Sequence, residues 1–222
     1  MANKKNTDNE RKKRAEIKFA YLYDASKRVL LIIDSLYSDF EKALILLIKN
    51  QEEKEEVIIN IYSLAFSLID NFHRFHQLIQ STTLLSKKLP EVIRLDEIIE
   101  PVKNCRNYLQ HMRGDLANIE DINFPIFGVI SWIDGNHQHV LFPNQEIGYA
   151  APSITIDTLE LKYLNKYLIS VGGKDVPIDR IYHELKVFWN WLEKISKFEK
   201  ESFKEYKWGK PQILSFSIKK GI

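Results

Sequence analysis

Residues 57–79 read VIINIYSLAFSLIDNFHRFHQLI, and this stretch indicates how the rest of the chain is organised. Its apolar residues cover most of the circumference of a helix, a pattern typical of a helix that is packed on several sides. Negative charge suits the first turns of a helix because of the helix dipole. Such charge precedes the stretch at Glu52, Glu53, Glu55 and Glu56. We therefore predict a central helix over roughly 53–80.

Helices are also predicted on both sides of this central one. Good helix formers dominate from about 10 to 50, and neither Gly nor Pro occurs before Pro90, so a long helix is expected there, either continuous or broken near Ser26 or Ser35.

A third helix is predicted near 91–100, after a loop that ends at Pro90. Proline suits the first turn of a helix and disrupts its interior, so Pro101 is expected to restart or kink the helix. The fourth helix then runs to about Met112 and stops at Gly114.

Residues 124–177 are rich in turn-forming residues, because they contain four of the seven prolines and five of the eight glycines. IFGVISWID and HQHVLF, joined across Gly135 and Asn136, resemble a hairpin, and SITIDT alternates as a strand does. LELKYLNKYLISV is compatible with either strand or helix. We interpret the whole segment as a small β insertion.

Helix is predicted again after Pro177, where apolar residues at steps of three and four form one stripe. These are Ile178, Ile181, Leu185, Phe188, Leu192 and Ile195. The tail KPQILSFSIKKGI is a candidate edge strand. The predicted fold is mainly α: a helical bundle with a small antiparallel β insertion before the last long helix, α+β overall.

This interpretation divides the chain into five parts. They are a basic, flexible arm (1–14), a helical bundle (15–123), the β insertion (124–177), a closing helix of the bundle (178–206) and a tail (207–222). The basic N-terminal segment could bind a phosphate backbone electrostatically, or it could be an ordinary solvated first part of a helix.

Composition narrows the class of protein. The chain has 222 residues, a net charge of +2 and one cysteine, which excludes an intramolecular disulfide and a zinc site built from cysteines. No signal peptide is evident, and the most apolar window, VLLIIDSLYSDFEKALILLI, carries too many charges for a membrane span. We expect a cytoplasmic protein with no membrane partner, no metal and no cofactor.

The stretch KNCRNYLQHMRG, residues 103–114, combines Arg106, Asn107 and His111 on one predicted helix. At about 100° per residue, Asn107 lies almost opposite the apolar side that includes Cys105, and His111 lies one turn above Asn107. Arg106 lies at the flank, from which its long side chain can reach the same edge. The three side chains are therefore expected to point away from the bundle, as ordinary exposed residues or as a site.

The sequence RNYLQH resembles the Arg-x(4–6)-His signature of the HEPN superfamily of helical bundles. In its ribonuclease version a polar residue, often Asn, follows the Arg, and His comes after three more residues. The resemblance implies that residues 15–112 and 178–205 form the family core. It also implies a homodimeric, metal-independent endoribonuclease in stress response or phage defence, with RNA or nucleotide as partner. A non-enzymatic module that binds nucleotide, RNA or protein remains the alternative.

These residue types suit RNA cleavage, because the 2′-hydroxyl of RNA is a built-in nucleophile. The imidazole of His111 titrates near neutral pH and can transfer protons. The guanidinium of Arg106 can bind phosphate oxygens and stabilise the charge of a pentacoordinate phosphorane, and Asn107 can orient either group. One site has a single His, whereas cleavage needs an acid and a base. The resemblance implies that two subunits supply them.

A polar line on the central helix includes Asp70 and Arg74. These two can pair with each other at i,i+4, or Asp70 can orient Arg106, as an acidic residue does in some relatives. The spacing of Asp70, His73 and Arg74 (DxxHR) also resembles sequences that accompany the motif in bacterial members of the superfamily.

Two features depart from the family. In its toxin branch, which a nucleotidyltransferase partner neutralises, a Tyr stands two residues after the His, where this chain has Arg113. Modification of that kind is therefore not expected, and an inhibitor protein is left open as a partner. The β insertion could shape an RNA-binding edge or bury the motif.

Other candidate residues have simpler interpretations. His137 and His139 share a face with metal-compatible spacing, but no third ligand accompanies them, so a surface strand is expected. His76 is predicted to be a hydrogen-bonded core residue, and Cys105 a small buried hydrophobe. Aromatic packing rather than base stacking is expected of the tryptophans Trp132, Trp189, Trp191 and Trp208.

Overall fold

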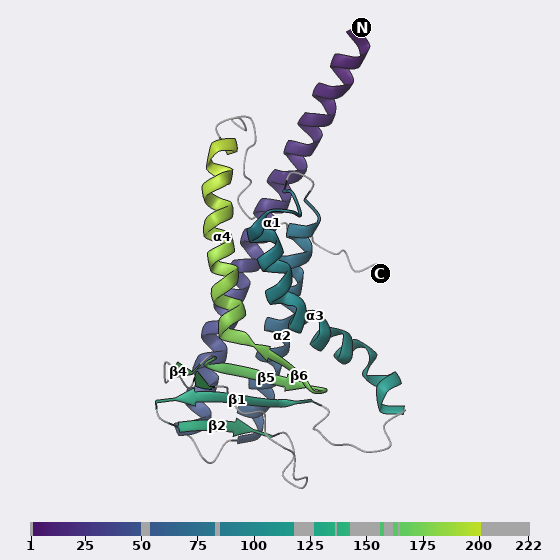
Figure 1. The fold of residues 1–222 in the computed structure, drawn as a ribbon. Helices are drawn as coiled ribbons and strands as arrows, with labels where there is room; N and C mark the ends of the chain where they lie inside the picture. Colours follow the sequence, from purple (N-terminus) through teal and green to yellow (C-terminus); the bar gives the residue numbers. More distant parts are fainter. Residues whose placement is uncertain are drawn as a thin grey trace, which may run out of the picture.

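The structure is a computed structural model that describes residues 2–49, 54–82, 85–117, 127–135, 137–142, 156–157, 162–163 and 165–200. Within these residues the protein is mainly helical, with a four-stranded antiparallel sheet and a separate pair of short strands (Figure 1). None of the described helices is both long enough and apolar enough to cross a membrane.

Two long helices, α1 (Ala2–Lys49) and α2 (Lys54–Gln80), pack along each other and form the centre of the molecule. The central helix predicted over 53–80 is confirmed. Of the two alternatives for the first helix, the continuous one is found: α1 runs unbroken through Ser26 and Ser35. Residues 2–14, which we expected to form an arm, belong to this same helix, and its first turns project beyond the other elements (Figure 1).

The predicted third and fourth helices are a single helix, α3 (Pro90–Ala117), with Pro101 in its interior. Of the two alternatives at Pro101, a new start is therefore not found, and the predicted stop at Gly114 was wrong, since α3 continues to Ala117. A proline in the interior of a helix removes one backbone hydrogen bond, and its ring clashes with the preceding turn. Together these effects cost about 3 kcal/mol. Burial of Ile99, Val102 and Cys105 on both sides of it offsets this cost. Along its length α3 turns away from α2 (Figure 1), as proline-containing helices do.

The strands all lie within the segment predicted as a β insertion. In the main sheet the order is β2 (His137–Leu141), β1 (Val129–Asp134), β5 (Tyr167–Val171), β6 (Lys174–Pro177), with every neighbouring pair antiparallel. The hairpin predicted across Gly135 is confirmed by the pairing of Asp134 with His137.

The second, two-stranded sheet pairs β3 (Ile156–Asp157) with β4 (Lys162–Tyr163). The strand predicted in SITIDT is thus reduced to two described residues. The ambiguous piece LELKYLNKYLISV contains β4 and β5, so its described residues are strand and not helix.

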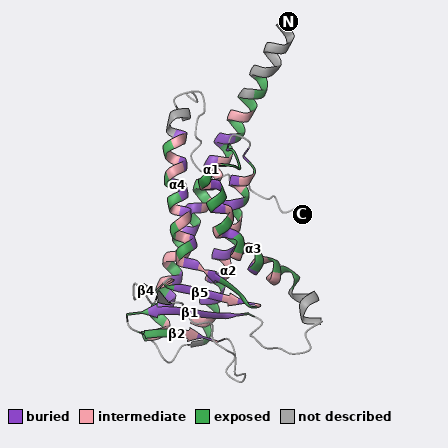
Figure 2. Cartoon of the chain, in the orientation of Figure 1, coloured by how far each residue is buried: buried purple, intermediate pink, exposed green. Residues whose placement is uncertain are grey.

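Helix α4 (Ile178–Lys200) returns to the bundle and closes it. The predicted apolar stripe is confirmed: five of its six members are buried and Ile195 is half-buried. Figure 2 shows buried residues along the bundle helices and on strands β1 and β5. The predicted end of this helix at 206 and the candidate edge strand in the tail lie outside the described residues.

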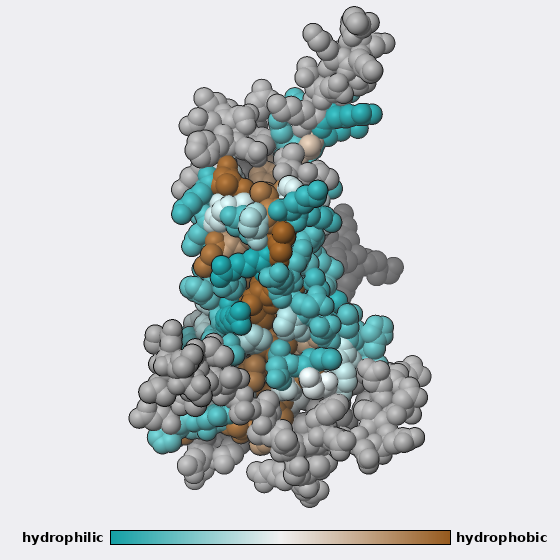
Figure 3. Space-filling view, in the orientation of Figure 1, coloured by the Kyte–Doolittle hydropathy of each residue, from teal (hydrophilic) through white to brown (hydrophobic). Residues whose placement is uncertain are grey.

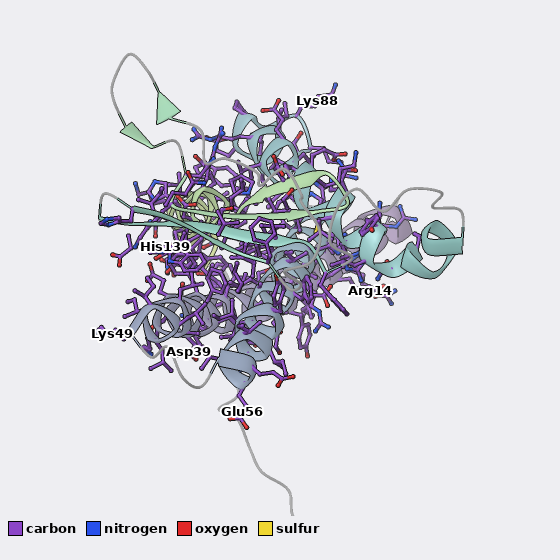
Figure 4. All side chains as sticks on the ribbon, turned by 90° about the horizontal axis from the view of Figure 1, so that it is seen from below. Arg14, Asp39, Lys49, Glu56, Lys88 and His139 are labelled. Carbon is purple, nitrogen blue, oxygen red and sulfur yellow. The ribbon has the colours of Figure 1, made fainter. Side chains whose placement is uncertain are left out.

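The sheet lies at the end of the bundle where α1 ends and α2 begins, and Figure 4 shows it from below with His139 and Lys49 marked. The hydroxyl of Tyr62 donates to the backbone oxygens of Gly128 and Leu141, at 3.1 and 3.3 Å. The hydroxyl of Tyr167 donates to Glu41 at 2.6 Å. These buried or half-buried bonds join the sheet to α2 and to α1.

Candidate functional site on the rim between α2 and α3

The motif residues lie on α3 with the orientation that the helical spacing predicted. Cys105 is fully buried, whereas Asn107 and His111 are exposed, and the side chain of Arg106 retains 29% of its accessible surface. The three polar side chains therefore point away from the core of the bundle. The β insertion does not bury them within the described part of the chain.

Tyr108, in the middle of the motif, contacts the turn between β5 and β6. Gly172 in this turn has a φ of +56°, and a Cβ built there would lie 2.6 Å from Cδ2 of Tyr108. The ring thus occupies the space that only a glycine leaves open. This contact fixes the motif segment of α3 against the sheet, so the insertion determines where the motif lies.

Asp70 contacts Arg106 across the interface of α2 and α3. The Nε of Arg106 donates to Oδ1 of Asp70 at 3.0 Å, and the side chain of Asp70 is 51% exposed. Among the described residues, Asp70 pairs with Arg106 and not with Arg74. Of the two arrangements that the sequence left open, the structure has the one in which Asp70 pairs with Arg106.

His73 is a further residue of this region; in the sequence it stood out only as part of the DxxHR pattern, with no role assigned to it. Its Nδ1 is buried and has no hydrogen-bond partner within the described part of the chain. Burial lowers the pKa of His73, and the positive charges of Arg106 and Lys103 lower it further, while Asp70 acts in the opposite direction. The sequence signal for it was its position three residues after Asp70, on the same side of the helix.

We call the polar residues on this edge of the molecule the α2–α3 rim. They are Asp70, His73 and Arg74 from α2, and Lys103, Arg106, Asn107 and His111 from α3. The Nζ of Lys103 also forms an ion pair with Oε2 of Glu100, at 3.5 Å.

His76, one turn beyond His73, is a structural residue, as predicted. It is 5% exposed, and its Nε2 lies 2.5 Å from Oδ1 of Asp96, which also accepts from Gln80 at 2.7 Å. Burial lowers the pKa of His76 even though the hydrogen bond to Asp96 raises it. This group joins α2 to the first half of α3 and lies on the far side of His73 from Asp70 along α2.

The remaining candidates also have structural roles. His137 is exposed, and His139 stacks on the buried Trp132 with ring centres 5.1 Å apart. In the described ranges, no three His, Cys, Asp or Glu residues are grouped so as to hold a metal ion. Burial raises the pKa of Cys105 to about 12, so its thiol is protonated at neutral pH. Trp189 is buried and Trp191 half-buried, whereas Trp208 lies outside the described residues.

The comparisons with known proteins leave the family open. No protein-family model, curated protein or solved structure matches this chain. What is said of function below is therefore argued from the residues of the rim.

The rim is separate from the groove between α3 and α4. That groove has a volume of about 640 Å³ and is lined by residues such as Ile93, Arg94, Arg180 and Glu184. Figure 3 shows a broken band of hydrophobic side chains among hydrophilic ones on the face that carries α3 and α4. No rim residue lines the groove, so a ligand at Arg106 would lie outside it.

Proposed function

We propose that the protein is a HEPN-like, metal-independent endoribonuclease that acts as a homodimer. The observation that carries the proposal is the hydrogen bond from Arg106 to Asp70, beside an exposed Asn107 and His111 on the same helix. A carboxylate that fixes one nitrogen of a guanidinium leaves its remaining N–H groups directed for an anion.

In this proposal each side chain has one role. Arg106 binds the phosphate whose ester bond is cleaved, and its charge stabilises the phosphorane. His111 removes the proton of the 2′-hydroxyl, or donates a proton to the leaving 5′-oxygen. Asn107 positions these groups, and Asp70 positions Arg106.

The dimer follows from what one subunit lacks. Cleavage requires a proton acceptor and a proton donor, whereas one motif supplies one exposed histidine. The open rim also leaves the reacting atoms in water, where electrostatic stabilisation is weak. A second rim related by a twofold axis supplies the other histidine and closes the site.

The test is cleavage of end-labelled RNA in the presence of EDTA. We expect products with 2′,3′-cyclic phosphate ends, loss of activity by about 10²-fold or more in His111→Ala, and a comparable loss in Arg106→Ala. Matched controls are His183→Ala and Arg180→Ala, which remove exposed residues of the same types from α4.

Two outcomes would contradict the proposal. RNA that stays intact under all conditions favours a non-enzymatic module that uses the same rim for binding. A protein that light scattering shows to be strictly monomeric at the assay concentration excludes a site shared by two subunits.

A further inference from the structure

The first part of α1 extends past the bundle and is strongly basic. Residues 1–18 contain seven Lys and Arg residues against three Asp and Glu residues. Residues 10, 11 and 13–18 are all exposed or half-buried, and the core begins only at Phe19. Figure 1 shows this part of the helix reaching beyond the other elements. Its charges therefore face solvent.

Three of these cations share one face of the helix. At about 100° per residue, Arg11, Arg14 and Lys18 lie within about 60° of one another and cover about 10 Å of the helix axis. All three are exposed. Glu10 lies at the border of this face and Glu16 on the opposite side, so the face has an excess of positive charge.

These three cations form no ion pair within the described part of the chain. Further along α1, by contrast, Arg28 pairs with Asp24 at 2.8 Å. Like charges one turn apart destabilise a helix, and the cations at 11, 14 and 18 are spaced in this way. A polyanion that binds along the face removes this repulsion.

Exposed nonpolar side chains lie beside the cations. Tyr21 is 61% exposed and Ile17 is 41% exposed. Around the helix axis, Tyr21 lies about 20° from Arg14 and about 60° from Lys18. An aromatic ring beside a row of cations is the combination that binds single-stranded nucleic acid, because the cations follow the phosphates and a base stacks on the ring.

We propose that this face of α1, formed by Arg11, Arg14, Lys18 and Tyr21, binds single-stranded RNA through its phosphates and through a base stacked on the ring. The inference goes beyond the proposed function, because it requires neither cleavage nor the motif. The motif packs on the sheet through Tyr108, whereas the start of α1 extends from the opposite end of the bundle (Figure 1). The face is thus a second surface for RNA.

Charge alone would also suit an anionic membrane, but the nonpolar residues do not. A helix that lies in a membrane interface needs a wide nonpolar face. Ala15 and Ile17 are the only nonpolar residues in 10–18, and they lie about 160° apart around the helix. A stacked base needs only one exposed ring, which Tyr21 provides. The residues therefore favour RNA.

The experiment uses the full chain and a fluorescent, unstructured 2′-O-methyl oligoribonucleotide, whose blocked 2′-hydroxyl prevents cleavage. Anisotropy gives the affinity at several salt concentrations for the unmodified protein and for Arg11→Gln/Arg14→Gln/Lys18→Gln. Each phosphate contact contributes about 0.7 to the slope of log affinity against log salt for a single strand. For the triple variant we expect binding about tenfold weaker or more at low salt and a slope shallower by about 2.

The matched control removes the same charge from three exposed cations elsewhere: Lys27→Gln/Lys49→Gln/Arg180→Gln. We expect its affinity and salt slope to stay close to those of the unmodified protein. Equal losses in the two triple variants would show attraction by net charge alone and overturn the proposal. Absence of oligonucleotide binding by the unmodified protein would also overturn it.

Replacement of Tyr21 tests the stacking separately. Tyr21→Ala should weaken binding about tenfold with an unchanged salt slope, whereas Tyr21→Phe, which keeps the ring, should bind like the unmodified protein. Equal losses in both variants, or no loss in Tyr21→Ala, would contradict the role of the ring.

Vesicles of phosphatidylcholine and phosphatidylserine test the membrane alternative. Binding to these vesicles without binding to the oligonucleotide would assign the face to a lipid surface and overturn the proposal. Absence of RNA cleavage tests the proposed function alone, because none of these measurements depends on cleavage.

Discussion

Asp70 and Arg106 are joined across the α2–α3 interface by a hydrogen bond of 3.0 Å from Nε to Oδ1. They are 36 positions apart in the chain, so the contact exists only because α3 packs beside α2. In the described part of the chain this bond occupies one of the five N–H donors of the guanidinium. Within the described residues, the ion pair with Asp70 involves Nε and not the terminal nitrogens.

Replacement of this acid tests its positioning role. Asp70→Ala is expected to lower the rate of RNA cleavage by about 10- to 100-fold, because Arg106 loses the hydrogen-bond acceptor that fixes its orientation. The free energy of unfolding should change by about 1 kcal/mol or less, since the carboxylate of Asp70 is half-exposed. Asp39→Ala, which removes an exposed carboxylate of α1 that is likewise paired with a cation, is the control, and an equal loss of rate in it would indicate a general effect of charge.

The contact between Gly172 and Tyr108 predicts a large difference between two adjacent glycines. Both have positive φ, so alanine at either position costs about 1–2 kcal/mol from the backbone. Only at Gly172 does the new Cβ meet the Tyr108 ring, whereas nothing lies within 4 Å at Gly173. Urea unfolding should show that Gly172→Ala is less stable than Gly173→Ala by about 1–3 kcal/mol. Equal losses would mean that the ring moves aside at no cost.

The buried His76 predicts how stability depends on pH. Its folded-state pKa lies below the ordinary value of 6.5, mainly because of burial, so the unfolded chain takes up a proton first as pH falls. The stabilisation is complete above the unfolded-state pKa and is lost as pH falls towards and through the folded-state pKa. Urea unfolding between about pH 7.5 and pH 5 should therefore show a decline that is smaller in His76→Gln. His183→Gln, an exposed control, should keep the full decline.

The single cysteine should be inert in the folded protein. Cys105 is fully buried, and burial raises its pKa to about 12, so neither access nor thiolate is available to a thiol reagent. We expect no labelling in buffer and complete labelling of one thiol per chain in denaturing urea. Rapid labelling in buffer would mean that α3 opens next to the motif, contrary to the packing described above.

Local patterns in the sequence were sufficient to predict most of the helices and strands. Each of these patterns is formed by residues that are close together in the chain. They are the apolar circumference of α2, the apolar stripe on α4, and the glycines and prolines of the insertion. Pro101 shows where such patterns are insufficient: the local preference allowed a new helix or a kink, and the burial of Val102 and Cys105 holds one helix through it. The exposure of Asn107 and His111 was predictable, because one helical turn determines it.

The sequence by itself determined the periodicity of the helices, the place of the insertion and the side of α3 on which the motif lies. Only the tertiary structure decided that Asp70 bonds to Arg106 and not to Arg74, and that the Nδ1 of His73 is buried beside them. The physical reason is that both results depend on how α2 and α3 lie against each other. That arrangement follows from the packing of the whole core and from the contact of Tyr108 with Gly172, not from the spacing of residues within one helix.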